Sequence, residues 1–133
     1  MKKATVTISF DEEKLAALGM YLEQKNNKVE TELEKAIFSL EETGVHNINL
    51  VTPTHYVPQI IFALSEAKRK GLSIPIVYNT GSYENLETLK MLDGYVDIYM
   101  PDIKYMDSNI SQRYSNAKDY FEVASRAVAE MVR

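Results

Sequence analysis

The segments IPIVYNTGSYE (residues 74–84) and YVDIYMPDIKY (residues 95–105) decide the fold of this chain. Each begins with a mostly apolar run that is typical of a buried strand, and a short amphipathic stretch separates the two. Parallel sheets bind their ligands at the carboxyl ends of their strands. The polar residues that we expect at those ends, and that we interpret as half of a small-molecule site, are Asn79, Thr80, Asp102 and Lys104.

Strands alternate with helices on both sides of these segments. Such alternation indicates right-handed βαβ units and a parallel sheet. We therefore predict an α/β fold with a partial (β/α) barrel-like parallel sheet. The predicted strands are residues 47–51, 74–78 and 96–100, and the predicted helices are residues 56–70, 84–92 and 119–132, with one helical turn at 110–114.

The N-terminal part of the chain has a different character. A period-two strand from Ala4 to Phe10 precedes a helix whose apolar face is Leu15, Leu18 and Leu22. A second amphipathic helix follows and ends near Gly44, which suits a left-handed helix cap. Residues 1–43 contain no proline, whereas residues 44–133 contain all four prolines and both histidines. We therefore predict a strand-helix-helix module at 1–43 and a second domain at 44–133, with the helical residues 37–42 assignable to either.

Composition excludes several kinds of chemistry. The chain of 133 residues has a formal net charge of −4 and no cysteine. Disulfides, thiolate zinc sites, a cysteine nucleophile and a cysteine-held iron–sulfur cluster are therefore excluded. The longest basic run is residues 68–70, so bulk charge favours neither nucleic acid nor an anionic membrane. The basic start MKKATVT lacks an apolar core, and we expect a cytoplasmic protein that does not enter the membrane.

Three short motifs carry the candidate chemistry, and each has an ordinary structural alternative. In VTPTHY (residues 51–56), Thr54 either helps to hold a ligand or simply caps the next helix. In YNTGSY (residues 78–83), Asn79 and Thr80 either face a ligand or form a common turn. In MPDIKY (residues 100–105), Asp102 and Lys104 either hold a zwitterion or form a salt bridge at the strand end.

The region from about residue 37 to residue 133 resembles the radical S-adenosylmethionine family, in the branch of the pyruvate formate-lyase activating enzymes. The resemblance lies in HNINLVTPTHYVPQI, GLSIPIVYNT, LDGYVDIYMPDIKY and RYSNAKDYFEVA, in this order. It implies a partial (β/α) barrel in which a [4Fe–4S] cluster donates an electron to S-adenosylmethionine. The product of that step in the family is a 5′-deoxyadenosyl radical that abstracts hydrogen.

By position, the resemblance places Thr52 and Thr54 near the methionine amino group of S-adenosylmethionine. It places Asn79 and Thr80 beside the ligand, and Asp102 and Lys104 near a cation and the methionine carboxylate. One departure concerns the turn, because the relatives read NTSGY and this chain reads NTGSY at residues 79–83. We expect the exchange to move the residue that tolerates positive φ by one position and to distort the turn.

A second departure limits the function. The family's CxxxCxxC loop is missing together with the first strands, so this chain cannot ligate the [4Fe–4S] cluster and cannot cleave S-adenosylmethionine reductively. We therefore predict no catalytic or metal-binding residues. The predicted function is a fragment or rearranged radical S-adenosylmethionine-type domain that keeps part of the ligand cleft, or alternatively a gene-fusion product with no selected function.

The N-terminal module resembles ribbon-helix-helix proteins and small uncharacterised proteins of bacterial mobile elements, through TVTISFDEEKLAAL and VETELEKAI. This resemblance implies a homodimer in which the strands from Ala4 to Phe10 pair and read DNA, with Lys3, Thr5 and Thr7 as readers. The alternative function is therefore a ribbon-helix-helix DNA-binding dimer that carries an inert α/β fragment. The module is acidic, with six lysines against nine Asp or Glu in residues 1–43. The alternative is that the strand and two helices only cover the sheet edge.

Overall fold

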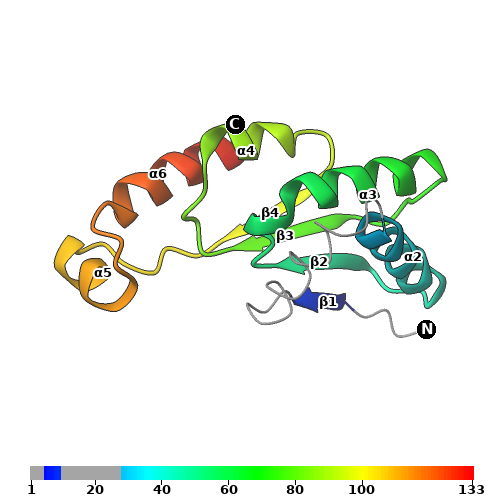
Figure 1. The fold of residues 1–133 in the computed structure, drawn as a ribbon, viewed down its shortest axis with the longest axis horizontal. Helices are drawn as coiled ribbons and strands as arrows, with labels where there is room; N and C mark the ends of the chain where they lie inside the picture. Colours follow the sequence, from blue (N-terminus) through cyan, green and yellow to red (C-terminus); the bar gives the residue numbers. More distant parts are fainter. Residues whose placement is uncertain (1–4, 10–27) are drawn as a thin grey trace.

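The computed structural model describes residues 5–9 and 28–133. The predicted helix that carries Leu15, Leu18 and Leu22 lies outside the described residues, as does Lys3. In the described part, an α/β arrangement of strands and helices is present throughout (Figure 1). The prediction of the fold class is therefore confirmed.

Four parallel strands form one open sheet in the order β1-β2-β3-β4. The strands are β1 (Thr5–Ser9), β2 (Asn47–Val51), β3 (Ile76–Thr80) and β4 (Ile98–Pro101). Each strand pairs with the next one along the chain, as in a stretch of a (β/α) barrel, but the sheet does not close. Within this chain the first strand joins the sheet as an edge strand, since β1 pairs with β2 from Thr5 to Ser9. The homodimer through Ala4 to Phe10 stays a prediction.

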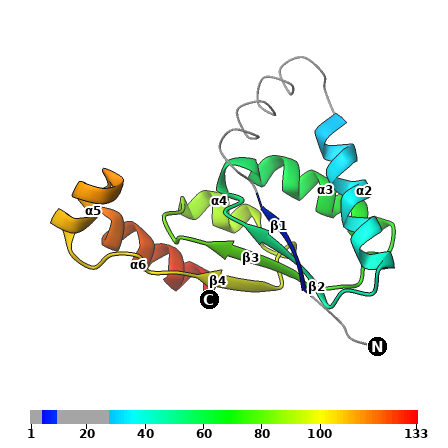
Figure 2. The same ribbon diagram turned by 90° about the horizontal axis from the view of Figure 1, so that it is seen from below.

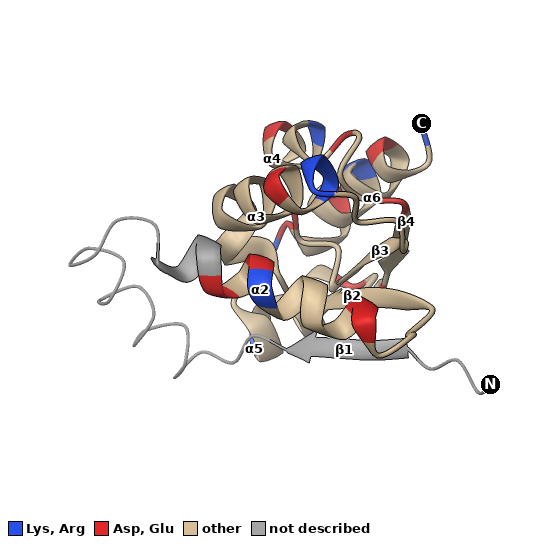
Figure 3. Ribbon diagram, turned by 90° about the vertical axis from the view of Figure 1, so that its right-hand side faces the viewer, with Lys and Arg blue, Asp and Glu red and all other residues tan. Residues whose placement is uncertain are grey.

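The helices form a layer over one face of this sheet (Figures 1 and 2). They are α2 (Lys28–Glu42), the short 3-10 helix η1 (Thr54–Tyr56), α3 (Val57–Arg69), α4 (Leu86–Met91) and α6 (Tyr120–Met131), while α5 (Ser108–Ser115) lies beyond the carboxyl ends of the strands. Acidic and basic residues both lie on the described helices (Figure 3). Lys70, at the end of α3, pairs with Glu34 of α2 at 2.5 Å.

The core lies between the sheet and the helices. Alternate residues of β2 and β3 point into it, and Ile48, Leu50, Ile76 and Tyr78 have no exposed surface. They pack against Ile37 of α2, Ile60 and Leu64 of α3, Leu89 of α4 and Ala127 of α6. Ile37 and Ile48 share one cluster although they lie on opposite sides of the predicted boundary after residue 43, and that boundary stays a prediction.

We call the opposite face of the sheet the open face, because no helix of the described ranges lies over it (Figure 2), although Val77 on this face is only 4% exposed. By the strand register, Asn49, Val77 and Ile98 form one row across this face, and Val51, Asn79 and Met100 form the next. Ile98 and Met100 on β4 are 47% and 49% exposed. One residue beyond β4, alternation returns Asp102 to this open face.

The strand 47–51 is confirmed at both ends, but the next two strands begin and end later than predicted. Residues 74–78 become Ile76–Thr80, because Pro75 has no N–H to donate and the ladder continues through Asn79 and Thr80. Residues 96–100 become Ile98–Pro101. Asn79 and Thr80 therefore lie within a strand, and their prediction as residues that follow it was wrong.

The helix starts also differ from the predictions. The predicted helix 56–70 is preceded by η1, and α3 begins at Val57 without a side-chain cap. The alternative that Thr54 caps this helix is therefore wrong. The predicted helix 84–92 starts only at Leu86, because Asn85 Oδ1 accepts from the N–H groups of Glu87 and Thr88. Among the described residues, no helix is long and apolar enough to cross a membrane.

Candidate functional site

The carboxyl ends of β2, β3 and β4 meet at one edge of the sheet, which we call the carboxyl edge. The ladder extends one residue past the strands there: Thr52 N–H donates to Asn79 O at 2.8 Å, and Asp102 N–H donates to Thr80 O at 2.9 Å. These bonds bring the loops that follow β2 and β4 up against β3. The six predicted site residues all lie at this edge or just beyond it.

The six residues nevertheless divide into two groups that face different ways. Asn79 lies on the open face of the sheet, whereas Thr80 lies on the helix side and is only 3% exposed. Thr54 is half-buried on the same side as Thr80. We call Thr52, Asn79, Asp102 and Lys104 the outward group and Thr54 and Thr80 the inward group. Sequence reasoning did not separate Asn79 from Thr80, although strand alternation places neighbours on opposite faces.

Within the outward group, Asp102 and Lys104 form an ion pair in which Nζ lies 2.6 Å from Oδ2. Both side chains stay more than half exposed, at 60% and 52%. The hydrogen bond to Asp102 raises the pKa of Lys104 above its ordinary value, so the amine is charged. An exposed pair of this kind contributes little to stability. Because both side chains are exposed, their charges are accessible to a ligand that carries both a positive and a negative group.

Thr52 adopts an unusual backbone conformation at the start of the loop after β2. Its φ is +53°, in the left-handed region that a β-branched residue rarely occupies. The bond from Thr52 N–H to Asn79 O holds it there. The side chain is exposed, so the strain places a hydroxyl at the carboxyl edge without burying it.

The inward group is organised by a residue that sequence reasoning missed. Glu84 is 3% exposed, and its Oε1 accepts hydrogen bonds from Thr54 Oγ1 at 2.7 Å and from Thr80 Oγ1 at 2.5 Å. Tyr78 OH also donates to Oε1, at 3.3 Å. The two threonine hydroxyls are thus engaged by a buried carboxylate. In the sequence, Glu84 gave no signal, because an acidic residue near a helix start is common.

Burial and the neighbouring Glu84 carboxylate both raise the pKa of Tyr78 well above its ordinary value. The phenol therefore stays protonated and remains a hydrogen-bond donor. Glu84 Oε2 is buried, and no group of the described residues donates to it. The carboxylate is therefore held by hydroxyl donors on one oxygen alone.

The turn after β3 shows which residue of NTGSY adopts the left-handed conformation. Residue 82 has a φ of +68°, whereas Gly81 does not have a positive φ. The left-handed position is therefore residue 82, where the resembling family has glycine, whereas the glycine of this chain lies one position earlier, as the exchange predicted. Ser82 therefore carries the backbone strain of the left-handed conformation. It is fully buried, and its Oγ lacks a partner among the described residues.

The loops of the carboxyl edge are also joined by Tyr120, the first residue of α6. Its hydroxyl donates to Gly81 O at 2.6 Å and accepts from Lys104 N–H at 2.8 Å. The side chain is only 4% exposed. The backbone beside Lys104 is therefore fixed relative to the turn after β3.

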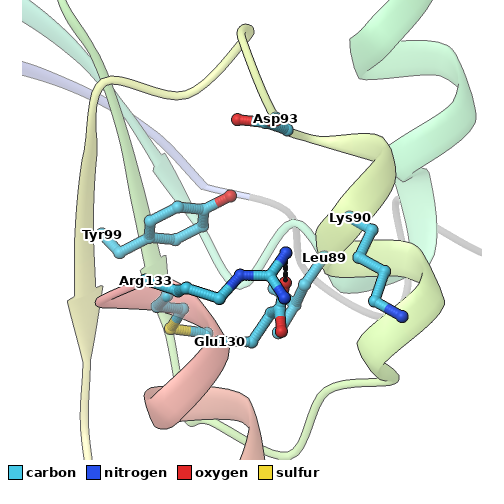
Figure 4. Close-up of a pocket in the computed structure, with 7 residues that line it drawn as sticks. Leu89, Lys90, Asp93, Tyr99, Glu130 and Arg133 are labelled. Carbon is cyan, nitrogen blue, oxygen red and sulfur yellow. Dashed lines mark ion pairs between the residues drawn. The ribbon is translucent and has the colours of Figure 1, made fainter.

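A separate hollow of about 490 Å³ lies between the C-terminal ends of α4 and α6 and the strand β4 (Figure 4). Figure 4 shows Arg133 paired with Glu130 near the Tyr99 ring, and the two charges lie 3.1 Å apart. None of the six predicted residues lines this hollow. Since acidic and basic groups both line it, its charge favours no particular ligand.

The donor set limits what the carboxyl edge can do. It offers an ammonium, a carboxylate, an amide and hydroxyls, which bind and orient polar ligands. A [4Fe–4S] cluster does not fit this donor set, because its ligands are cysteine thiolates and the chain has no cysteine. In residues 5–9 and 28–133, no three His, Asp or Glu side chains gather as a metal site requires.

Comparison with known proteins gives two similarities. A family described as of unknown function (DUF6103) matches residues 1–50. The uncharacterized protein MJ0674 of Methanocaldococcus jannaschii is 33% identical over 82 residues, which are 60% of this chain and 23% of that protein. The chain thus spans less than a quarter of the length of this curated relative. No solved structure matches. Neither description names an activity or a ligand.

We predict that Ser82→Gly stabilises the protein by about 1 kcal/mol, because glycine removes the left-handed strain and the unpartnered hydroxyl. Urea unfolding followed by circular dichroism measures the change. The control is Ser111→Gly, since Ser111 is also fully buried but lies in α5 and bonds to Ser108 O. That change should destabilise the protein. Destabilisation by Ser82→Gly would contradict the assigned strain.

A second prediction concerns alkaline pH. The unfolded chain releases the Tyr78 proton near its ordinary pKa of 10.0, whereas the folded chain retains it. The contribution of Tyr78 to the free energy of unfolding is therefore fully present below about pH 10. Above that pH it decreases, by up to about 1.4 kcal/mol per pH unit. Tyr78→Phe should lose free energy of unfolding less steeply than the wild type between about pH 10 and 11. Equal slopes in urea titrations would refute the assignment.

Proposed function

We propose that this chain is a cytoplasmic, radical S-adenosylmethionine-type fragment that binds the amino-acid end of S-adenosylmethionine or of a close analogue, without radical chemistry. The observation that supports this proposal most is the exposed pair of Asp102 and Lys104, 2.6 Å apart at the carboxyl edge. Crevices at the carboxyl ends of parallel strands are the usual ligand sites of such folds.

The outward group suits a zwitterion. The amino-acid end of the ligand carries an ammonium and a carboxylate on one carbon, and the pair of Asp102 and Lys104 carries the complementary charges side by side. In the proposed complex, Lys104 binds the ligand carboxylate and Asp102 binds the ammonium. Charge-assisted hydrogen bonds of this kind are about twice as strong as neutral ones. Asn79 supplies a neutral hydrogen-bonding group on the adjacent strand β3, and Thr52 supplies another at the end of β2, one strand further away.

The inward group has a supporting role in this proposal. Because the hydroxyls of Thr54 and Thr80 both donate to Glu84, we assign these two residues to the shape of the loops and not to direct ligand contact. This assignment changes the roles expected from the family resemblance, in which both residues lie beside the ligand.

The proposed function stops at binding. Reductive cleavage of S-adenosylmethionine needs an electron, and in the resembling family the [4Fe–4S] cluster supplies it. The chain contains no cysteine to hold that cluster. We therefore propose no step in which the bound sulfonium is cleaved.

Isothermal titration calorimetry with S-adenosylhomocysteine tests the proposal. The wild type should bind, and Lys104→Ala should weaken binding about tenfold, because one charge-assisted hydrogen bond is lost. The matched control is Lys35→Ala, since Lys35 is also an exposed lysine in an ion pair, with Glu32 of α2. It should bind like the wild type.

Two results would count against the proposal. One is the absence of heat from the wild type at ligand concentrations of a few millimolar, which corresponds to less than about 4 kcal/mol of binding free energy. The other is an equal loss of affinity in Lys104→Ala and Lys35→Ala, which would show that the carboxyl edge is not the site.

A further inference from the structure

A second concave surface begins where the carboxyl edge ends, and its volume is about 470 Å³. We call it the tyrosine groove. Its walls come from the turn after β3, the loop after β4, the turn between α5 and α6, and the first residue of α6. The lining residues that matter here are Gly81, Tyr83, Lys104, Tyr105, Asn116 and Tyr120.

Three aromatic rings shape the groove. The Tyr120 ring lies parallel to the Tyr83 ring, with their centroids 5.8 Å apart and an interplanar angle of 12°. The Tyr105 ring meets Tyr120 edge to face at 5.3 Å and 82°. Tyr83 is 46% exposed, so its ring remains accessible. The groove therefore offers aromatic surface to a ligand.

The hydroxyl groups of these tyrosines are already engaged, which fixes the rings. Tyr83 OH donates to Asp119 at 2.8 Å, and Tyr105 OH lies 2.9 Å from Ser115 Oγ. Tyr120 OH donates to Gly81 O. Binding therefore orders few side chains that were free before, and preorganisation of this kind lowers the entropic cost of association.

The charge of the groove selects the sign of its ligand. Of the described residues that line it, only Lys104 is charged. Its ammonium has three N–H donors and one Asp102 oxygen within 2.6 Å. This ammonium repels a cationic ligand, although Asp102 on Lys104 and Asp119 on Tyr83 OH lie beside the lining and offset part of that repulsion. An anionic group is attracted to the ammonium.

We propose that the tyrosine groove binds a small aromatic carboxylate, with its ring against Tyr83 and Tyr105 and its carboxylate on Lys104. The volume lies within the range of small-molecule sites, which is roughly 300–1,000 Å³. Both this proposal and the S-adenosylmethionine proposal use Lys104. The groove proposal does not depend on the S-adenosylmethionine proposal, because the aromatic walls lie outside the outward group.

Indole-3-acetate is a suitable probe, because the protein has no tryptophan and the indole can be excited beyond the absorption of its tyrosines. The wild type should give a saturable change in emission. Tyr105→Leu and Lys104→Met should each weaken binding about five- to tenfold, through loss of the ring contact and of the charge. Tyr105→Phe should bind the probe like the wild type, since it keeps the aromatic ring. The control is Tyr114→Leu, because Tyr114 is a 67% exposed tyrosine of α5 outside the groove.

Several results would overturn the inference. They are the absence of saturation at about 10 mM probe, equal binding of cyclohexylacetate, and equal binding of indole-3-acetamide. Equal losses in Tyr105→Leu and Tyr114→Leu would also overturn it. Circular dichroism of each variant confirms that it is folded. If indole-3-acetate binds as expected but S-adenosylhomocysteine does not, the proposed function is refuted and the groove proposal is supported. If S-adenosylhomocysteine binds and indole-3-acetate does not, only the groove proposal is refuted.

Discussion

The hydrogen bonds that Glu84 Oε1 accepts from Thr54, Thr80 and Tyr78 fix the candidate site. Thr54 belongs to the segment after β2, Thr80 ends β3, and Glu84 precedes α4. One buried carboxylate therefore joins three successive segments beneath the carboxyl edge. A buried polar group is costly unless it is hydrogen-bonded, so the three hydroxyl donors on Oε1 hold these segments together. The outward group is held by other bonds, from Thr52 N–H to Asn79 O, from Asp102 N–H to Thr80 O and from Lys104 N–H to Tyr120 OH.

The same constraint explains why strained residues gather at this edge. Thr52 and Ser82 both have positive φ, and each lies within two residues of a member of the Glu84 network. The loops after β2 and β3 must turn sharply to bring hydroxyls to the carboxylate, and non-glycine residues carry the cost. Such strain persists only where the surrounding structure determines it. The edge displays Asn79, Asp102 and Lys104 on the open side.

The sequence predicted the alternation of strands and helices, because apolar periodicity reflects burial directly. It placed 47–51 correctly, and strand alternation placed Asp102 and Lys104 together, as their ion pair confirms. It did not place Asn79 and Thr80, because the ladder extends past the apolar run into polar residues. It also missed Glu84 and the left-handed φ of Ser82, which arise from contacts between distant segments and not from local composition.

The most direct test of the central claim is a crystal structure of the protein grown with S-adenosylhomocysteine. The account predicts the ligand's amino-acid end on Asp102 and Lys104, with the hydroxyls of Thr54 and Thr80 still bound to Glu84. A ligand that takes the Thr54 and Thr80 hydroxyls from Glu84, or a carboxyl edge that binds nothing at saturating concentration, would contradict it.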